Sequence, residues 1–250
     1  MSDRSASGEG APAGYRERPA SRLPGAQIWT RPAGGGPEED TRVLPDGCMD
    51  LIWHEAADGL LVAGPDTRAH TSRSTPDAGW AGLRLPPGVA PALLGVPAHE
   101  LRDRRVPLAE VLPLTRARRL TARVDRATDR GAMLERIALE LAGEPPDPLC
   151  QAVAAGLRRG RPVAELADEV ALSPRQLHRR ALAAFGYGPK TLARVLRLRA
   201  ALPLITSGRP LAEVAAATGY ADQAHLTREV RALTGLPPGR LRSHPAGTAA

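Results

Sequence analysis

The sequence is poor in aromatic residues and in cysteine. Aromatic residues make up 3% of its 250 residues, with a single phenylalanine. This argues against a protein that stacks successive bases of a single strand on aromatic side chains. The two cysteines, Cys48 and Cys150, are too few for a disulfide framework or a zinc finger. We therefore expect neither a metal nor a cofactor.

Long hydrophobic runs are also absent. No stretch approaches the roughly 18 consecutive apolar residues that a membrane span needs, and residues 1–30 lack the apolar run of a signal peptide. At 42% hydrophobic and 24% charged residues, the composition is close to that of a globular protein, which excludes collagen and wholesale disorder. The sequence predicts a cytoplasmic protein without membrane contact.

An excess of basic charge is confined to the C-terminal part. Residues 1–144 carry 19 Arg and 20 acidic residues, whereas residues 145–250 carry 14 Arg, one Lys and 7 acidic residues, a balance of +8. A domain of this kind attracts polyanions, because binding releases condensed counterions. The charge favours nucleic acid as the partner. An arginine-rich coding bias would give the same count, so a motif has to support the interpretation.

The first half of the chain alternates short apolar runs with turn sequences. Residues 1–24 show no periodicity and are expected to be a disordered tail. Beyond them, each of the three tryptophans lies in a different apolar run, which indicates a small β-rich core. After Pro97 the apolar spacing changes to three and four, as in amphipathic helices. The strands are expected at 26–30, 41–44, 49–54, 60–63 and 80–85, and the helices at 98–112, 114–128 and 132–142.

A proline-rich stretch at residues 143–148 separates two domains. The predicted fold is a two-domain α+β protein. Residues 25–143 form a β-rich sensor or dimerisation domain closed by helices, and residues 149–243 form an all-α domain. The helices of the first domain could cover their own sheet or form a dimer interface, and the sequence favours neither.

The second domain contains an internal repeat with a period of about 48 residues. The letters PVAELA at 162–167 parallel PLAEVA at 210–215, and each is followed by a turn and a helix of about twelve residues. This is helix-turn-helix geometry. Ser173 before Pro174 can cap the second helix of the first copy, and Asp222 can cap its counterpart in the second copy.

The second helix of each copy has one apolar and one polar face. Leu177, Ala181 and Phe185 are expected to face the core in the first copy, and Leu226, Val230 and Leu233 in the second. The opposite faces carry donors that suit base edges and phosphates in a major groove. The candidate DNA-binding residues are Arg175, Gln176, His178, Arg179 and Arg180 in the first copy, and Gln223, His225, Thr227, Arg228 and Arg231 in the second.

A helix from Lys190 to Leu202, which Pro203 is expected to end, connects the copies. Thirteen residues at about 1.5 Å each give a spacer roughly 20 Å long. With the flanking helices it could hold the two reading helices about 34 Å apart, which is one turn of DNA. The expected target is therefore two adjacent major-groove segments of double-stranded DNA.

These residues resemble the AraC/XylS family of bacterial transcription regulators, over about residues 150–243. The most specific stretch is GYADQAHLTR at 219–228, followed by TGLPP at 234–238. The resemblance implies a double helix-turn-helix domain in a cytoplasmic activator or repressor, with base contacts from Arg175, His178, Arg179, Gln223, His225, Thr227 and Arg228. At Ala181, Leu192 and Val230 the family usually has aromatic residues, so a lighter core is expected.

More loosely, residues 25–143 resemble the small N-terminal domain of some actinobacterial members, through PDGCMDL at 45–51 and LGVP at 94–97. In the wider family such domains are β-rich, often cupin-like, and bind a small effector or mediate dimerisation. The resemblance thus implies control through the N-terminal domain. An unidentified small-molecule effector, RNA polymerase and a second copy of the chain are the further candidate partners.

Asp46, Cys48, Asp50 and His54 lie within nine residues and suggest an alternative. They could form a metal site, or Cys48 could be the methyl acceptor of a DNA repair enzyme. A turn and a buried thiol explain the same letters, and residues 44–53 contain no basic residue to activate a thiolate. A DNA-compacting protein is a third alternative, but it would not need two helices with different polar faces. We therefore predict a regulator without catalytic residues.

Overall fold

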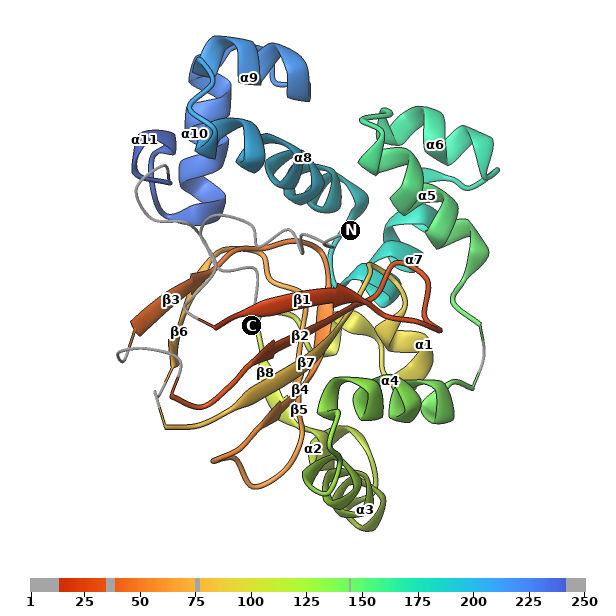
Figure 1. The fold of residues 1–250 in the computed structure, drawn as a ribbon. Helices are drawn as coiled ribbons and strands as arrows, with labels where there is room; N and C mark the ends of the chain where they lie inside the picture. Colours follow the sequence, from red (N-terminus) through yellow and green to blue (C-terminus); the bar gives the residue numbers. More distant parts are fainter. Residues whose placement is uncertain (1–13, 35–38, 75–76, 144, 242–250) are drawn as a thin grey trace, which may run out of the picture.

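The computed structural model describes residues 14–34, 39–74, 77–143 and 145–241. A β-rich domain with helices on one face precedes a purely helical domain, as predicted (Figure 1). The first domain contains β1 (Arg16–Pro19), β2 (Gln27–Arg31), β3 (Glu39–Val43), β4 (Met49–His54), β5 (Leu61–Ala63), β6 (His70–Ser74), β7 (Trp80–Leu85), α1 (Ala90–Leu94), the 3-10 helix η1 (Ala98–Glu100), β8 (Arg105–Pro107), α2 (Leu108–Val111), α3 (Leu114–Asp125) and α4 (Arg130–Leu141).

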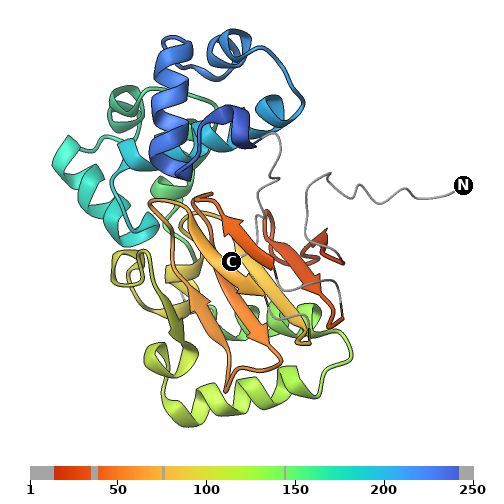
Figure 2. The same cartoon turned by 90° about the vertical axis from the view of Figure 1, so that its left-hand side faces the viewer.

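Six strands form an antiparallel sheet in the order β1-β2-β7-β4-β5-β8, and β3 pairs with β6 in a separate two-stranded sheet. Alternation along the strands gives the large sheet two different faces. Leu51, Trp53 and Leu83 point into a core that α4 and its neighbouring helices cover. Trp29 and Ile52 lie on the other face. Figure 2 shows the strands in front of these helices.

The helices of the first domain cover their own sheet, because α4 packs across β2, β4 and β7. Its residues Leu134, Ile137 and Ala138 are buried there. Of the two roles that the sequence left open, the structure therefore gives α4 the intramolecular one. The cupin-like form is not tested by the strand order and stays a prediction.

Several predictions for the first domain were wrong. Residues 16–19 of the expected tail form β1, and the buried carboxylate of Glu135 holds the segment after it through Ser21, Arg22 and Leu23. Residues 1–13 lie outside the described residues. The helix expected over 98–112 is instead η1, β8 and α2, because residues 105–107 pair with β5. The polar strand β6 was not predicted, because its sequence does not alternate apolar and polar residues.

The second domain contains α5 (Pro148–Arg158), α6 (Val163–Glu169), α7 (Pro174–Phe185), α8 (Pro189–Thr206), α9 (Leu211–Thr218), α10 (Gln223–Thr234) and α11 (Pro238–Leu241). The connecting helix α8 continues one turn past Pro203, contrary to the prediction. Thr206 and Ser207 donate hydrogen bonds to the carbonyls of Leu202, Pro203 and Leu204, which gives these carbonyls at the end of the helix a partner.

Helix α8 belongs to two separate cores. Leu192 and Leu196 pack with α5, α6 and α7, whereas Val195, Leu198 and Ile205 pack with α9, α10 and α11. It is the one element of the described chain that is buried in both clusters. Ala181, Leu192 and Val230, where a lighter core was expected, are fully buried.

Candidate nucleic-acid interface

The first reading helix, α7, begins with the predicted cap. The Ser173 hydroxyl accepts a hydrogen bond from the Gln176 amide, and the Gln176 side chain accepts one from the Ser173 amide, which completes a capping box. Two residues earlier Ala171 has a φ of 51°, a left-handed conformation that costs an alanine about 1 kcal/mol. Leu177, Ala181 and Phe185 are buried, so the opposite side of α7 faces outward.

The second reading helix, α10, begins in the same way. Gly219 takes the left-handed conformation with a φ of 75°, at the place in the repeat that Ala171 occupies in the first copy. The Asp222 carboxylate accepts a hydrogen bond of 2.6 Å from the His225 amide. Leu226, Val230 and Leu233 are buried. The repeat in the sequence therefore corresponds to a repeat in structure.

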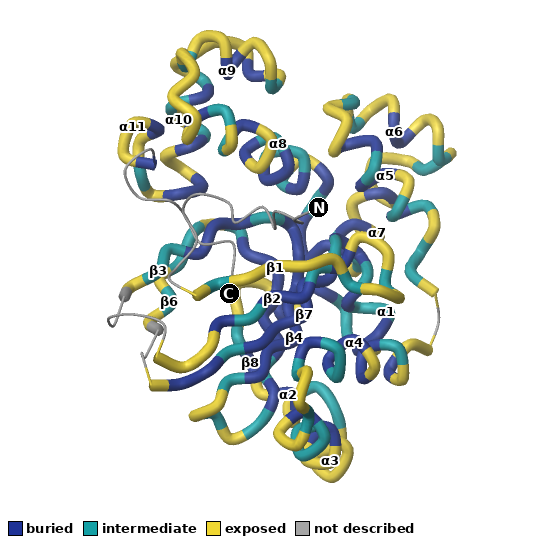
Figure 3. Tube along the Cα trace, in the orientation of Figure 1, coloured by how far each residue is buried: buried dark blue, intermediate teal, exposed yellow. Residues whose placement is uncertain are grey.

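All ten predicted residues lie on these two helices. In α7 all five are exposed, and in α10 Gln223, Arg228 and Arg231 are exposed while His225 and Thr227 are half-buried. Figure 3 shows that the outer turns of the helical domain are exposed, whereas the strands at the centre of the sheet are buried. Nothing in the described chain covers the two polar faces.

Half of these side chains already have local partners. Gln176 accepts the capping hydrogen bonds, and the Thr227 hydroxyl donates to the Gln223 carbonyl at 2.9 Å. His225 Nδ1 accepts from the Ala221 amide, and its ring meets Tyr220 edge to face at 5.4 Å. The His178 ring lies against Gly188, so close that a Cβ there would be 2.7 Å from it.

Arg180 is the fifth of these residues. Its Nη1 donates to Asp147 at 2.9 Å, and this carboxylate also caps the start of α5. Arg180 was predicted to bind DNA, but in the structure it is paired within the protein. The sequence could not indicate that Asp147 pairs with Arg180, because the two residues lie 33 positions apart in the chain.

The side chains of the remaining five residues form no hydrogen bond or ion pair with the described residues. They are Arg175, Arg179, Gln223, Arg228 and Arg231. Four of them are arginines, whose forked donors match guanine edges and phosphates. The helices therefore present unpaired cationic donors to solvent.

An ion pair fixes α10 on the connecting helix. Arg194 of α8 donates from Nε and Nη2 to Glu229 of α10, at 2.6 and 3.2 Å. Arg197 lies with its guanidinium carbon 5.3 Å from the centre of the Tyr220 ring. Glu229 was not among the predicted site residues, although it is the one acidic residue within α10.

Of the four residues that suggested a metal or thiol site, Asp46, Cys48 and Asp50 lie around Arg84 and Arg199, whereas His54 lies apart from them. Asp50 accepts a hydrogen bond from Trp29 Nε1 at 2.8 Å, whereas the His54 ring stacks on Trp80 at 3.7 Å. Within the described residues there is no group of three His, Cys, Asp or Glu that could hold a metal ion.

Cys48 is buried and lies 3.6 Å from Arg199 of α8. Burial, followed by the charge of Asp46, raises the pKa of the Cys48 thiol far above its usual range, although Arg199 acts in the opposite direction. A thiol in this state is a poor nucleophile. The geometry thus does not favour the methyl-acceptor alternative.

Asp50 belongs to a buried charged network on the open face of the sheet. Arg84 donates to Glu17 at 2.8 Å and lies 3.5 Å from both Asp46 and Asp50. Burial raises the pKa of Asp50 to about 6, Arg84 opposes this shift, and Asp46 adds to it. Through Asp46, which lies 3.4 Å from Arg199, the network reaches the helical domain.

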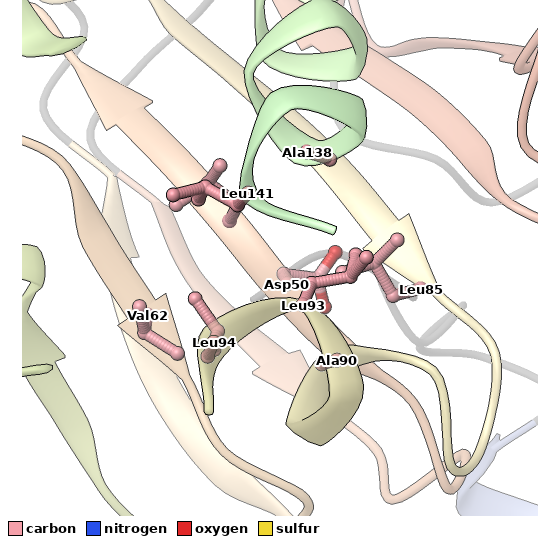
Figure 4. A pocket seen from close by; sticks show the side chains of 9 residues that line it. Asp50, Val62, Leu85, Ala90, Leu93, Leu94, Ala138 and Leu141 are labelled. Atoms are coloured by element: carbon pink, nitrogen blue, oxygen red, sulfur yellow. The ribbon is translucent and has the colours of Figure 1, made fainter. Parts of the chain in front are cut away.

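A small gap lies within the sheet domain, and a much larger cavity lies between the two domains. The gap in Figure 4, between the sheet and helices α1 and α4, has a volume of about 10 Å³, which admits at most one water molecule. A cavity of about 480 Å³ lies between the two domains. Residues from both domains line it, among them Gln27, Asp46, Arg84, Gln151, Arg158 and Arg199.

Comparisons with known proteins agree with this architecture. A family model described as a helix-turn-helix domain matches residues 166–244, which contain both reading helices and α8. Residues 166–244 form an AraC-type helix-turn-helix domain. The match supports DNA binding by the second domain. Residues 26–107 match a domain of unknown function, DUF6597. A comparison with curated protein sequences gives no match.

The chain is also similar to several solved structures. The C-terminal domain of AraT, a response regulator from Geobacillus stearothermophilus, is 20% identical and covers 40% of this chain and 88% of its own, with a TM-score of 0.38. A probable AraC family transcriptional regulator from Rhodopseudomonas palustris is also 20% identical, covering 40% and 99%, with a TM-score of 0.35. ToxT from Vibrio cholerae is 8% identical over 92% and 98%, with a TM-score of 0.45.

No helix within the described ranges is long and apolar enough to span a membrane.

Proposed function

We propose that this regulator reads one DNA site through two adjacent major-groove segments, one with α7 and one with α10. The observation that carries the proposal is the pair of exposed faces with unpaired arginines on two helices that share α8. In this proposal Arg175, Arg179, Gln223 and Arg228 contact base edges, and Arg231 contacts phosphate. His178, His225, Thr227, Gln176 and Arg180 shape or orient the two faces.

Substitution of one arginine in each helix tests this proposal. A preferred duplex is first selected from a random-sequence pool with the wild-type chain. Arg179→Ala and Arg228→Ala are each expected to lower affinity for that duplex by about 1–3 kcal/mol, or roughly 5- to 150-fold, as measured by fluorescence anisotropy. Each variant should also relax the sequence preference at the bases that its helix reads.

Arg118→Ala is the matched control, because Arg118 is an exposed arginine on α3 of the other domain. It removes the same charge and should leave affinity nearly unchanged. If the two reading-helix variants lose equal affinity for the selected duplex and for random DNA, the arginines do not read bases.

We further propose that the sheet domain controls DNA binding through a small effector in the 480 Å³ cavity. Its volume lies in the range of sites for small organic molecules. Arg84 is buried and keeps Nε and Nη2 without a hydrogen bond to the described residues, so it can bind a polar ligand group. Because both domains line the cavity, a ligand there would alter how they pack. RNA polymerase and a second copy of the chain stay predicted partners.

Filling the cavity from α8 tests this control. Ala200 lines the cavity, so the indole of Ala200→Trp should occupy the effector site and change affinity for the selected duplex at least 3-fold. Exposed Ala109 of α2 lies outside the cavity, and Ala109→Trp is the matched control. Equal affinities of the two variants would contradict control through this cavity.

A further inference from the structure

The carboxyl ends of both reading helices meet the sheet domain. The last carbonyls of an α-helix have no partner within the helix, and its negative end favours nearby cations. At the ends of α7 and α10, carbonyl groups accept hydrogen bonds from residues more than 80 positions earlier in the chain. Figure 1 shows the two helices on either side of α8, both ending at the sheet domain.

The end of α7 receives two side chains. Arg102 Nη1 donates to the Gly186 carbonyl at 3.2 Å, and His99 Nδ1 lies 3.3 Å from the Leu182 carbonyl. Gly186 is also packed so tightly that a Cβ there would lie 2.5 Å from Pro65. The segment around η1 thus fits closely against the last turn of α7.

The end of α10 is bound in a similar way. Arg42 Nη1 donates to the Thr234 carbonyl at 3.0 Å, and the Ala69 amide donates to the Leu233 carbonyl at 2.7 Å. Each reading helix therefore has one arginine of the sheet domain at its negative end, Arg102 for α7 and Arg42 for α10.

One short segment touches both helix ends. Residues 65–69 begin at Pro65, against α7, and end at Ala69, against α10. The segment is fixed to the sheet domain, because Asp66 forms two hydrogen bonds of 2.6 Å with Arg105 and Thr67 binds Asp103. It can therefore hold the ends of α7 and α10 at a fixed distance from each other.

A second connection matters because α8 is the one described element that both helical cores share. A single helix can bend, and two reading units joined by it alone would change their spacing at small cost. Contacts from the sheet domain to both α7 and α10 add a second connection between the two helices, beside α8. This restricts the unbound protein to fewer arrangements, which lowers the entropic cost of binding two segments at once.

We infer that Arg42 and Arg102 of the sheet domain are positioning residues for DNA recognition, which together with residues 65–69 set the spacing of the two reading helices. This rests on the proposed two-segment function. Neither arginine needs to touch DNA for this role. The sheet domain then determines which spacing of the two DNA segments the protein accepts.

The test uses the full chain and duplexes in which the two selected segments are moved apart or together by one to five base pairs. The wild-type chain should prefer one spacing sharply. The Arg42→Ala/Arg102→Ala double variant should bind that duplex about 5- to 10-fold more weakly and show a flatter spacing preference. Its affinity for a duplex with one segment, the other replaced by random sequence, should be unchanged.

Arg68→Ala/Arg104→Ala is the matched control, since both arginines are exposed, lie in the same part of the chain and do not bind a reading helix. It should keep the wild-type preference. Arg102→Ala alone, at an exposed position, replaces the double variant if the latter does not show a cooperative thermal transition.

The outcomes separate the two proposals. If the wild-type chain selects no two-segment duplex, the proposed function fails. If it does, but the double variant keeps the wild-type spacing preference or binds more tightly, the positioning role of Arg42 and Arg102 is wrong.

Discussion

Asp50 illustrates how the environment of one residue changes its chemistry. On the sequence it is one of four polar residues near a turn, and strand parity does not tell which face will be buried. In the structure it lies on β4 beside Trp29 and Arg84, and 7% of its surface is exposed. Burial, opposed by Arg84, raises the pKa of this carboxyl from 3.8 to about 6.

Asp50→Asn should therefore change the pH dependence of stability. The folded state binds the Asp50 proton more tightly than the unfolded state, so the free energy of unfolding falls as pH rises from about 4 to 6 and stays lower above. The effect is on the order of 3 kcal/mol. Asn stays neutral, so urea unfolding at pH 4.5 and pH 7 should show a smaller difference in the variant.

Exposed Asp58 provides the control, since Asp58→Asn leaves the network around Arg84 intact. An unaltered pH dependence in Asp50→Asn, equal to that of Asp58→Asn, would show that the Asp50 carboxyl titrates alike in the folded and unfolded states.

At the scale of elements, helices were easier to predict than strands. The reading helices α7 and α10 have twelve residues each, as expected, because their caps and apolar spacing both lie within one short stretch of sequence. Strands β1, β6 and β8 were missed because their pairing partners lie elsewhere in the chain. Residues close together in the sequence are enough to predict a helix, whereas the formation of a polar strand depends on pairing with a neighbouring strand.

Ser173→Ala should weaken the start of α7. It removes the side-chain half of the capping box and is expected to lower the free energy of unfolding by about 1 kcal/mol, as measured by urea unfolding. Ser173→Thr keeps the hydroxyl and should lose less. If Thr and Ala reduce stability equally, the hydroxyl does not cap the helix.

At the scale of the whole molecule, the charge and the fold together define the proposed DNA-binding surface. The basic excess of residues 145–250 lies in the helical domain, but ion pairs within the protein already engage several of its arginines. Only arginines without such pairs are fully available to phosphates. The net charge alone therefore overstates the number of DNA contacts.

The salt dependence of DNA binding should reflect this difference. The logarithm of affinity is expected to fall linearly with the logarithm of salt concentration. Arg231→Ala should reduce that slope by about 1, because it removes one phosphate contact. Arg180→Ala should change the slope much less, since Arg180 is paired with Asp147. Equal changes in the two variants would place Arg180 on DNA as well.

The sequence by itself determined the two-domain division, the repeated helix-turn-helix units with their caps, and the two helices that carry the candidate residues. These features depend on residues close together in the chain, where apolar spacing, capping side chains and turn residues act directly. Only the tertiary structure decided that Arg180 is paired with Asp147, that Asp50 is buried beside Arg84, and that the sheet domain binds the ends of both reading helices. These contacts join residues 33 to 192 positions apart, and no local pattern encodes which distant donor reaches a given carbonyl or carboxylate.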